Sequence, residues 1–347
     1  MRMNGSVKDL LSHMELLGLA SITSVFSDYA SRVILGWKSP DTMVLNAAAR
    51  ELTVDEVSAC VRAYLDDLLD EQELISQMID VGGKEHSPLS PRVAKGLNSK
   101  EWASYQSTRD EILDRAGVEN PLFVSLVTAL GFPAYWSKCL RSQKGRESLD
   151  MGASLWEMAP RNSGSEFMKN KYLEHLRFCE RFTVEDIAAH IRGEKVEDNG
   201  KDRNSSGLHA PAFHLDVLMS FIALTGISLF PVRPVTSGSV GSVSAGTMTT
   251  RVDRRRYNCF VLPVTKQPVT LGRYTSICRN PSMYEVANSA VRGQNDFGWH
   301  AAIGAPASWL GSHAVSHIVT FHRFAGGTPS CPEYYAQEGT VIPIERM

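Results

Sequence analysis

The chain has 347 residues, of which 43% are hydrophobic and 21% are charged, and these proportions exclude an intrinsically disordered protein. Its net charge at pH 7 is only -2. A polyanion would therefore have to bind a local basic patch, because screening by salt limits the range of each charge's interactions to about 8 Å. The six cysteines are scattered without C-x-x-C spacing, and residues 1–19 lack the uninterrupted apolar core of a signal peptide. A cytoplasmic protein with reduced thiols is therefore expected.

Helical spacing dominates the first half of the chain. Apolar residues recur with a helical period between Val7 and Leu17. Thr53 and Glu56 have the spacing of a capping box, in which two side chains satisfy orphan amides of a helix start. Capping and glycine signals predict three further helices, at about Ser99–Ala116, at Pro121–Leu130 and from Thr183 to near Gly193.

Charge is distributed unevenly along the sequence. Residues 50–80 contain nine carboxylates and two arginines, whereas residues 245–280 contain seven basic residues and one carboxylate. The first of these segments predicts an acidic helix that could dock a partner. The second is a local patch that could bind a polyanion despite the acidic net charge.

Several segments of the second half have distinct patterns. Residues 194–207 are polar with almost no apolar anchor, which predicts a flexible linker or a long exposed loop. The longest apolar run, residues 213–230, is slightly short for the roughly 20 residues of a bilayer span and predicts a buried helix. Residues 236–246 are rich in Gly and Ser. Strands are predicted at residues 258–265, 268–278 and 314–324, with an edge strand at residues 341–344.

Together these patterns predict an α+β protein, with a helix-rich N-terminal half and a mixed C-terminal half that contains an antiparallel sheet. No internal repeat is visible. The expected organisation is a mainly helical domain at residues 1–193, the linker or exposed loop at 194–207 and an α+β domain at 208–347.

Three consecutive arginines, Arg254, Arg255 and Arg256, lie between the Gly/Ser-rich stretch and a predicted strand. Their guanidinium groups are candidates to clamp the phosphates of a nucleic acid, together with Arg251 and Arg273. Tyr257 or Tyr274 could then stack on a base. The alternatives are a solvated basic turn, and a dock for an acidic partner that is either another protein or the acidic helix of this chain.

A second basic group, Lys138, Arg141 and Lys144, follows the aromatic residues of 132–136. Basic and aromatic residues interleave there, as they do in sites that combine phosphate contacts with base stacking. The alternative is that these aromatic residues belong to the core.

A third candidate is the polar loop that carries Arg161 and Asn162 towards a predicted helix start near Glu166, with Lys169 and Lys171 beyond it. Free amides and the helix dipole favour an anion at such a position. The alternative is that Asn162 closes the turn through backbone hydrogen bonds.

Four histidines lie late in the chain, at His300, His313, His317 and His322. A zinc site could be built from two of them with Cys331, but no H-E-x-x-H pattern accompanies them, so packed or surface histidines are expected. The sequence also lacks a P-loop, a G-x-S-x-G and a G-x-G-x-x-G. It therefore predicts no catalytic residue, no metal and no cofactor.

Four stretches of the chain, about a tenth of its length, resemble a known family. They are HMELLGLASI (13–22), ALGFPAYW (129–136), WEMAPRNSGSEF (156–167) and ALTGISLFP (223–231). Together they resemble the Cascade large-subunit-like and accessory proteins of type I CRISPR interference systems of the I-U/I-G kind. The resemblance implies a non-enzymatic subunit that contacts the backbone of target DNA, guide RNA or both, is a candidate reader of the target-adjacent motif, and works with other Cascade subunits and a recruited nuclease-helicase.

The leading hypothesis is a non-catalytic subunit of a nucleoprotein complex that binds nucleic acid mainly through phosphate contacts. One alternative is a hydrolase or transferase for an anionic substrate, with Arg161 and the arginine run as the anion clamp and His300, His313 or His317 as the base. Another is a protein-interaction scaffold that uses its basic patch on an acidic partner.

Overall fold

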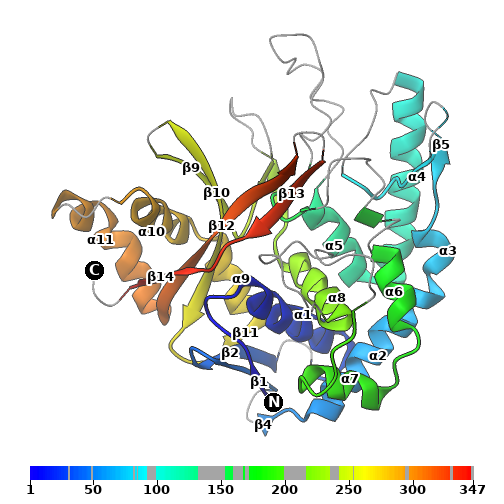
Figure 1. Ribbon diagram of the computed structural model, residues 1–347, viewed down its shortest axis with the longest axis horizontal. Coiled ribbons are helices and arrows are strands. Elements are labelled where there is room, and N and C mark those ends of the chain that lie inside the picture. The colour runs from blue at the N-terminus through cyan, green and yellow to red at the C-terminus, as the bar shows by residue number, and fades with distance from the viewer. Residues whose placement is uncertain are drawn as a thin grey trace.

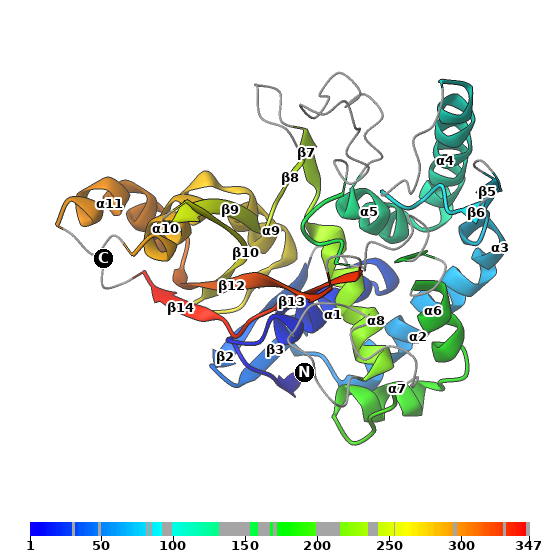
Figure 2. The same cartoon turned by 45° about the horizontal axis from the view of Figure 1, so that its top comes forward.

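The structure is a computed structural model of the chain (Figures 1 and 2). It describes residues 1–29, 32–47, 50–80, 83, 85–91, 99–131, 153–158, 167–168, 172–198, 216–234, 242–252, 254–293, 297–328 and 331–344. The predicted α+β class is confirmed, because helices predominate in the N-terminal part and an antiparallel sheet lies in the C-terminal part.

Helices α1, α2, α5 and α7 each begin at a side chain that accepts hydrogen bonds from free backbone amides. Asp9 accepts the amides of Leu11 and Ser12 at the start of α1, and the predicted capping box of Thr53 and Glu56 opens α2. The bounds are α1 Leu10–Phe26, α2 Val54–Asp70, α3 Gln72–Ile75, α4 Ser99–Glu119, α5 Pro121–Leu130, α6 Leu173–Cys179 and α7 Val184–Ile191. The predicted α5 and α7 are confirmed. The expected end of α4 at Gly117 is wrong, because the helix continues to Glu119 and the turn comes at Asn120, which caps α5.

An N-terminal sheet that the sequence analysis does not predict lies beside α1. Its order is β1 (Arg2–Asn4), β3 (Thr42–Ala47), β2 (Val33–Ser39) and β11 (Val269–Thr270), and β4 (Arg50–Glu51) pairs with β3. All of these pairings are antiparallel. Because β11 comes from the second half of the chain, both halves contribute to this sheet.

The predicted strand at residues 268–278 is wrong. After β11, which has two residues, the chain turns into helix α9 (Leu271–Arg279), and the Thr270 hydroxyl accepts the Arg273 amide at its start. The buried residues Tyr274, Ile277 and Cys278 are spaced three and four apart, so a helical period outweighs the β-branched content of the segment.

A second antiparallel sheet forms the C-terminal part, with the order β13, β12, β10 and β9, and β14 pairs with β12. The predicted strands at 258–265 and 314–324 and the edge strand at 341–344 are confirmed as β10, β12 and β14. The bounds are β9 Thr247–Val252, β10 Arg255–Thr265, β12 Val315–Thr328, β13 Cys331–Ala336 and β14 Thr340–Pro343. Two helices, α10 (Pro281–Val291) and α11 (Phe297–Ser312), lie on the far side of this sheet from α1 to α8 (Figure 1).

Two short hairpins and one helical segment complete the helices and strands of the described part. Strands β5 (Ile79–Asp80) and β6 (Glu85–His86) pair with each other, as do β7 (Val232–Pro234) and β8 (Ser242–Ser244). The apolar run at 213–230 is, in its described part, the buried helix α8 (Val217–Gly226) followed by the 3-10 turn η4 (Ile227–Leu229). None of the helices that the structure describes is long and apolar enough to cross a membrane.

The centre of the molecule is the crossing of α1 and α8, where two glycines allow the backbones to touch. A Cβ on Gly18 would lie 1.9 Å from the Ile222 carbonyl oxygen, and one on Gly226 would lie 2.6 Å from that of Met14. The helices come from opposite sides of the boundary expected at residues 194–207, and one hydrophobic core includes both. The division into two domains stays a prediction.

The four stretches that carry the family resemblance converge on this core as far as they are described. Two of them are α1 with Gly18 and the α8–η4 segment with Gly226, and a third closes α5, which packs against η4. Trp156, from the remaining stretch, stacks on Phe230 and Phe260 at ring-centroid distances of 4.6 and 4.4 Å. These motifs are therefore packing determinants in their described parts.

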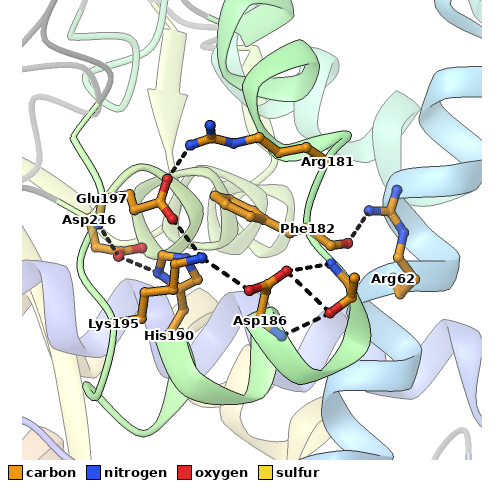
Figure 3. A network of polar contacts seen from close by, with 9 residues as sticks. Arg62, Arg181, Phe182, Asp186, His190, Lys195, Glu197 and Asp216 are labelled. Atoms are coloured by element: carbon orange, nitrogen blue, oxygen red, sulfur yellow. Dashed lines mark hydrogen bonds and ion pairs between the residues drawn. The ribbon is translucent and has the colours of Figure 1, made fainter.

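Arg62 ties α2 to the end of α6. Its Nη1 donates to the Phe182 carbonyl at 2.8 Å (Figure 3). The same Nη1 donates to the Glu180 carbonyl at 3.2 Å, and Nη2 pairs with Asp66 at 2.9 Å. The guanidinium thus satisfies carbonyls that the end of a helix leaves without partners.

We expect Arg62→Ala to lower the free energy of unfolding by about 1.5–3 kcal/mol, because it removes charge-assisted hydrogen bonds to half-buried carbonyls. Asp66→Ala is the matched control, since the Asp66 carboxylate is 62% exposed and such a surface pair contributes only about 0.5 kcal/mol. Chemical denaturation of both variants checks this. Equal effects would show that the carbonyl contacts contribute nothing.

Candidate nucleic-acid interface

Seven of the predicted binding residues lie outside the residues that the structure describes. They are Lys138, Arg141, Lys144, Arg161, Asn162, Lys169 and Lys171. Most of the predicted linker at 194–207 lies there as well. The remaining candidates are Arg251, Arg254, Arg255, Arg256 and Arg273.

Four of these arginines meet at the end of one β-hairpin, which we call the arginine hairpin: β9 and β10 with Arg251, Arg254, Arg255 and Arg256. The last cross-strand pair joins Val252 to Arg255, and the next pair places Arg251 directly opposite Arg256. In Figures 1 and 2 the hairpin end reaches away from helices α1 to α8. The predicted run is thus a cationic tip on a projecting ribbon.

Two features of this tip work against stability. Like charges directly opposite each other on a sheet repel, and Arg251 faces Arg256 in this way. Arg254 has φ 66°, a left-handed conformation that glycine or asparagine adopts with less strain. Strained features of this kind cluster at functional sites in proteins, and an anion bound here would offset the repulsion.

The four arginines are all exposed, and no hydrogen bond or ion pair joins their side chains to another residue in the described part of the chain. The acidic helix α2 is engaged elsewhere: Glu56 pairs with Arg50, and Asp66 pairs with Arg62. Within the described ranges, therefore, the arginine hairpin does not dock on the acidic helix of its own chain.

Arg273 is not part of the hairpin. It lies on α9, and its Nη2 donates to the His313 carbonyl at 2.9 Å, which supports the turn after α11. Its neighbour Tyr274 is 5% exposed, and burial raises the pKa of its hydroxyl well above the usual value, so its ring is not accessible to a base. Tyr257 on β10 is partly exposed.

The sheet forks next to the arginine hairpin. Strands β10 and β12 pair with each other from Cys259 and His322 to Thr265 and Val315. Before Cys259, β10 pairs only with β9, and after His322, β12 pairs with β13. Figures 1 and 2 both show the two ribbons diverging. At the fork the rings of Tyr257 and His322 lie 5.2 Å apart. The second arm, which we call the β12–β13 ribbon (residues 323–336), carries Arg323 stacked 3.8 Å from the ring centroid of Tyr334.

His313 and His317 lie towards the other end of β10 from the arginine hairpin. His313 stacks on Trp309 at 3.8 Å, and its Nδ1 lies 2.7 Å from the Trp309 carbonyl oxygen. His317 pairs with Val264, eight residues along β10 from Arg256, which corresponds to about 27 Å. Among the described residues, no group of three or more His, Cys, Asp or Glu side chains could hold a metal. The side chain of His300 lies outside the described part.

One histidine and one carboxylate do form a close pair, far from these candidates in sequence. The His190 Nδ1 lies 2.5 Å from Asp216 Oδ2 (Figure 3). Asp216 Oδ1 also accepts the Met219 amide at 2.8 Å as the cap of α8. The His190 side chain is fully buried and its ring packs 4.7 Å from that of Phe182. This pair joins α7 to α8, and a substrate could not reach the histidine.

The described cysteines are not activated nucleophiles. Burial raises the pKa of the Cys259 thiol, at the fork, to about 11, and it also raises the pKa of the other thiols described, those of Cys60, Cys179 and Cys278. These thiols stay protonated at neutral pH, and the thiol is a poor nucleophile.

The sequence analysis finds the arginines by composition but misses what surrounds them. The pairing of Arg251 with Arg256 depends on the hairpin register, and the exposed Phe324 of the β12–β13 ribbon depends on the fork. No local sequence signal indicates either. No protein-family model matches the chain, and no curated protein matches it in sequence.

Proposed function

We propose that the chain is a non-catalytic subunit of a cytoplasmic nucleoprotein complex, and that the arginine hairpin binds the phosphates of a nucleic acid. One observation carries the proposal: an exposed tip places four arginines together at a cost in repulsion and backbone strain, and without a partner among the described residues. Arginine binds phosphate bidentately, so a polyanion offsets that cost.

The resemblance of the four stretches favours one kind of complex, the type I CRISPR interference complex. The partners would then be target DNA or guide RNA, the other Cascade subunits and a recruited nuclease-helicase. An enzyme that combines the hairpin with His317 is a weaker alternative, because about 27 Å of strand separates the two. If such a complex retains the purified wild-type chain but does not retain the chain with an altered arginine hairpin, this assignment is supported.

The direct test is a hairpin variant, Arg251→Thr/Arg254→Gly/Arg255→Thr/Arg256→Thr, which keeps strand-forming residues in the strands and glycine at the left-handed position. We expect its affinity for a nucleic acid to fall about 100-fold or more at 0.15 M salt, because several charge-assisted contacts are lost. The slope of log affinity against log salt should become shallower by about 0.7 to 0.9 for each phosphate contact removed. Fluorescence anisotropy across a salt series measures both quantities.

The same variant should unfold at an equal or higher temperature than the wild type, since it removes like-charge repulsion and strain. Arg115→Ala and Arg177→Ala, on exposed faces of α4 and α6, are the matched controls and should leave affinity within about twofold. An unchanged affinity in the hairpin variant, or equal losses in the controls, would contradict the proposal.

A further inference from the structure

Phe324 is an exposed aromatic residue on the β12–β13 ribbon. Its side chain is 46% exposed, whereas Phe321 on the same strand and Phe260 on β10 are fully buried. It lies two residues beyond His322, where the sheet forks. A large apolar ring in this position leaves hydrophobic surface in water on one arm of the fork, and the arginine hairpin is the other arm.

The ring of Phe324 is held in place by its neighbours. Phe324 pairs across the ribbon with Tyr335, and a Cβ on Gly326 would lie 3.4 Å from the Phe324 ring and 3.1 Å from the Tyr335 ring. The glycine therefore leaves room for both rings side by side. Aromatic cross-strand pairs of this kind stabilise a sheet face and fix ring orientation.

Basic residues lie on both arms of the fork. Arg255 is two residues from Tyr257 on β10, which corresponds to about 7 Å along the strand, and Tyr257 contacts His322 at the fork. Arg323, on the opposite face of the β12–β13 ribbon from Phe324, stacks on Tyr334. Surfaces that bind single-stranded nucleic acid combine guanidinium groups, which contact phosphates, with exposed aromatic rings, on which bases stack.

We propose that the nucleic acid at the arginine hairpin is single-stranded, with an unpaired base stacked on Phe324. This inference rests on the proposed function and adds the state of the ligand. In a duplex the base faces are already stacked on one another, so only phosphates and groove edges would reach the fork, and Phe324 would gain no partner.

Three proteins test this: the wild type, Phe324→Ala and Phe324→Tyr. Binding is measured by anisotropy to a 20-nucleotide thymidine oligomer, to an abasic oligomer of equal length and to a 20-base-pair duplex. We expect Phe324→Ala to weaken binding to the thymidine oligomer about 5- to 100-fold, with the abasic oligomer and the duplex within about twofold of wild type. Phe324→Tyr retains the ring and should bind like the wild type.

Unfolding temperatures of the variants show whether a loss of binding reflects loss of the fold, and crosslinking of a 4-thiothymidine oligomer to the wild type gives a readout without any substitution. A crosslinked peptide that contains Phe324 or Tyr257 supports the inference, and crosslinks elsewhere only would overturn it. Equal binding of the thymidine oligomer by wild type and Phe324→Ala would also overturn it. If the wild type binds nucleic acids through the arginines alone, only this inference fails. If it binds none of the three, the proposed function fails too.

Discussion

Replacing Gly18 by alanine is expected to lower the free energy of unfolding by about 3 kcal/mol or more. The added methyl group would lie 1.9 Å from the Ile222 carbonyl oxygen and 2.7 Å from its carbon, so the obstacle is backbone and cannot rotate away. Helices α1 and α8 would have to separate along their crossing, which would open the core around them. Denaturant titration followed by far-UV circular dichroism measures the loss.

Gly117→Ala is the matched control for this experiment, because Gly117 also lies in a helix but has open space around it. The nearest atom to an added Cβ is Val124 Cγ2, at 3.9 Å. Alanine has the higher helix propensity, so this variant should gain about 0.5–1 kcal/mol. The same chemical change would then have opposite signs at two sites, and losses of similar size would contradict the close crossing of α1 and α8.

Local signals in the sequence predict the local parts of this fold. The capping boxes at Thr53 and Thr183 are both formed, since each depends only on side chains and amides within three residues. The N-terminal sheet is not predicted, because the buried residues of β2 and β3 come in runs of three consecutive positions and so lack the alternation that reveals a half-exposed strand. The close approach of Gly18 to α8 likewise depends on a segment about 200 residues away in the chain.

The candidate site also has features that local sequence predicts and features that depend on distant segments. An arginine run is visible in the sequence as composition, and its position next to a strand is enough to predict a cationic turn. Its geometry depends on register, which places Arg251 opposite Arg256, and on the left-handed conformation of Arg254. The exposure of Phe324 depends on where β12 parts from β10, which is a property of the whole sheet. The sequence pattern therefore reveals the charged residues but not the exposed aromatic ring on the other arm of the fork.

His13 should make the stability of the protein fall in mild acid. Its ring lies between those of Trp37 and Phe321, at 4.8 and 5.6 Å, and its Nε2 donates to the Val7 carbonyl at 2.9 Å. Burial lowers the pKa of this imidazole from 6.5 to about 4, although the hydrogen bond to Val7 and the nearby Asp9 oppose the change. The folded protein thus keeps His13 neutral where the unfolded chain binds a proton.

The pH window follows from these two values. Because the pKa is lower in the folded state, the contribution of His13 is complete above about pH 6.5 and is lost as the pH falls towards 4. Between pH 7.5 and 4.5 the expected loss is about 2–3 kcal/mol. We expect His13→Gln, which retains a donor for Val7 but does not titrate, to be less stable at pH 7.5 and to show a smaller loss on acidification. All other groups titrate in both proteins, so the difference between the two denaturation series isolates His13, and parallel series would contradict the assignment.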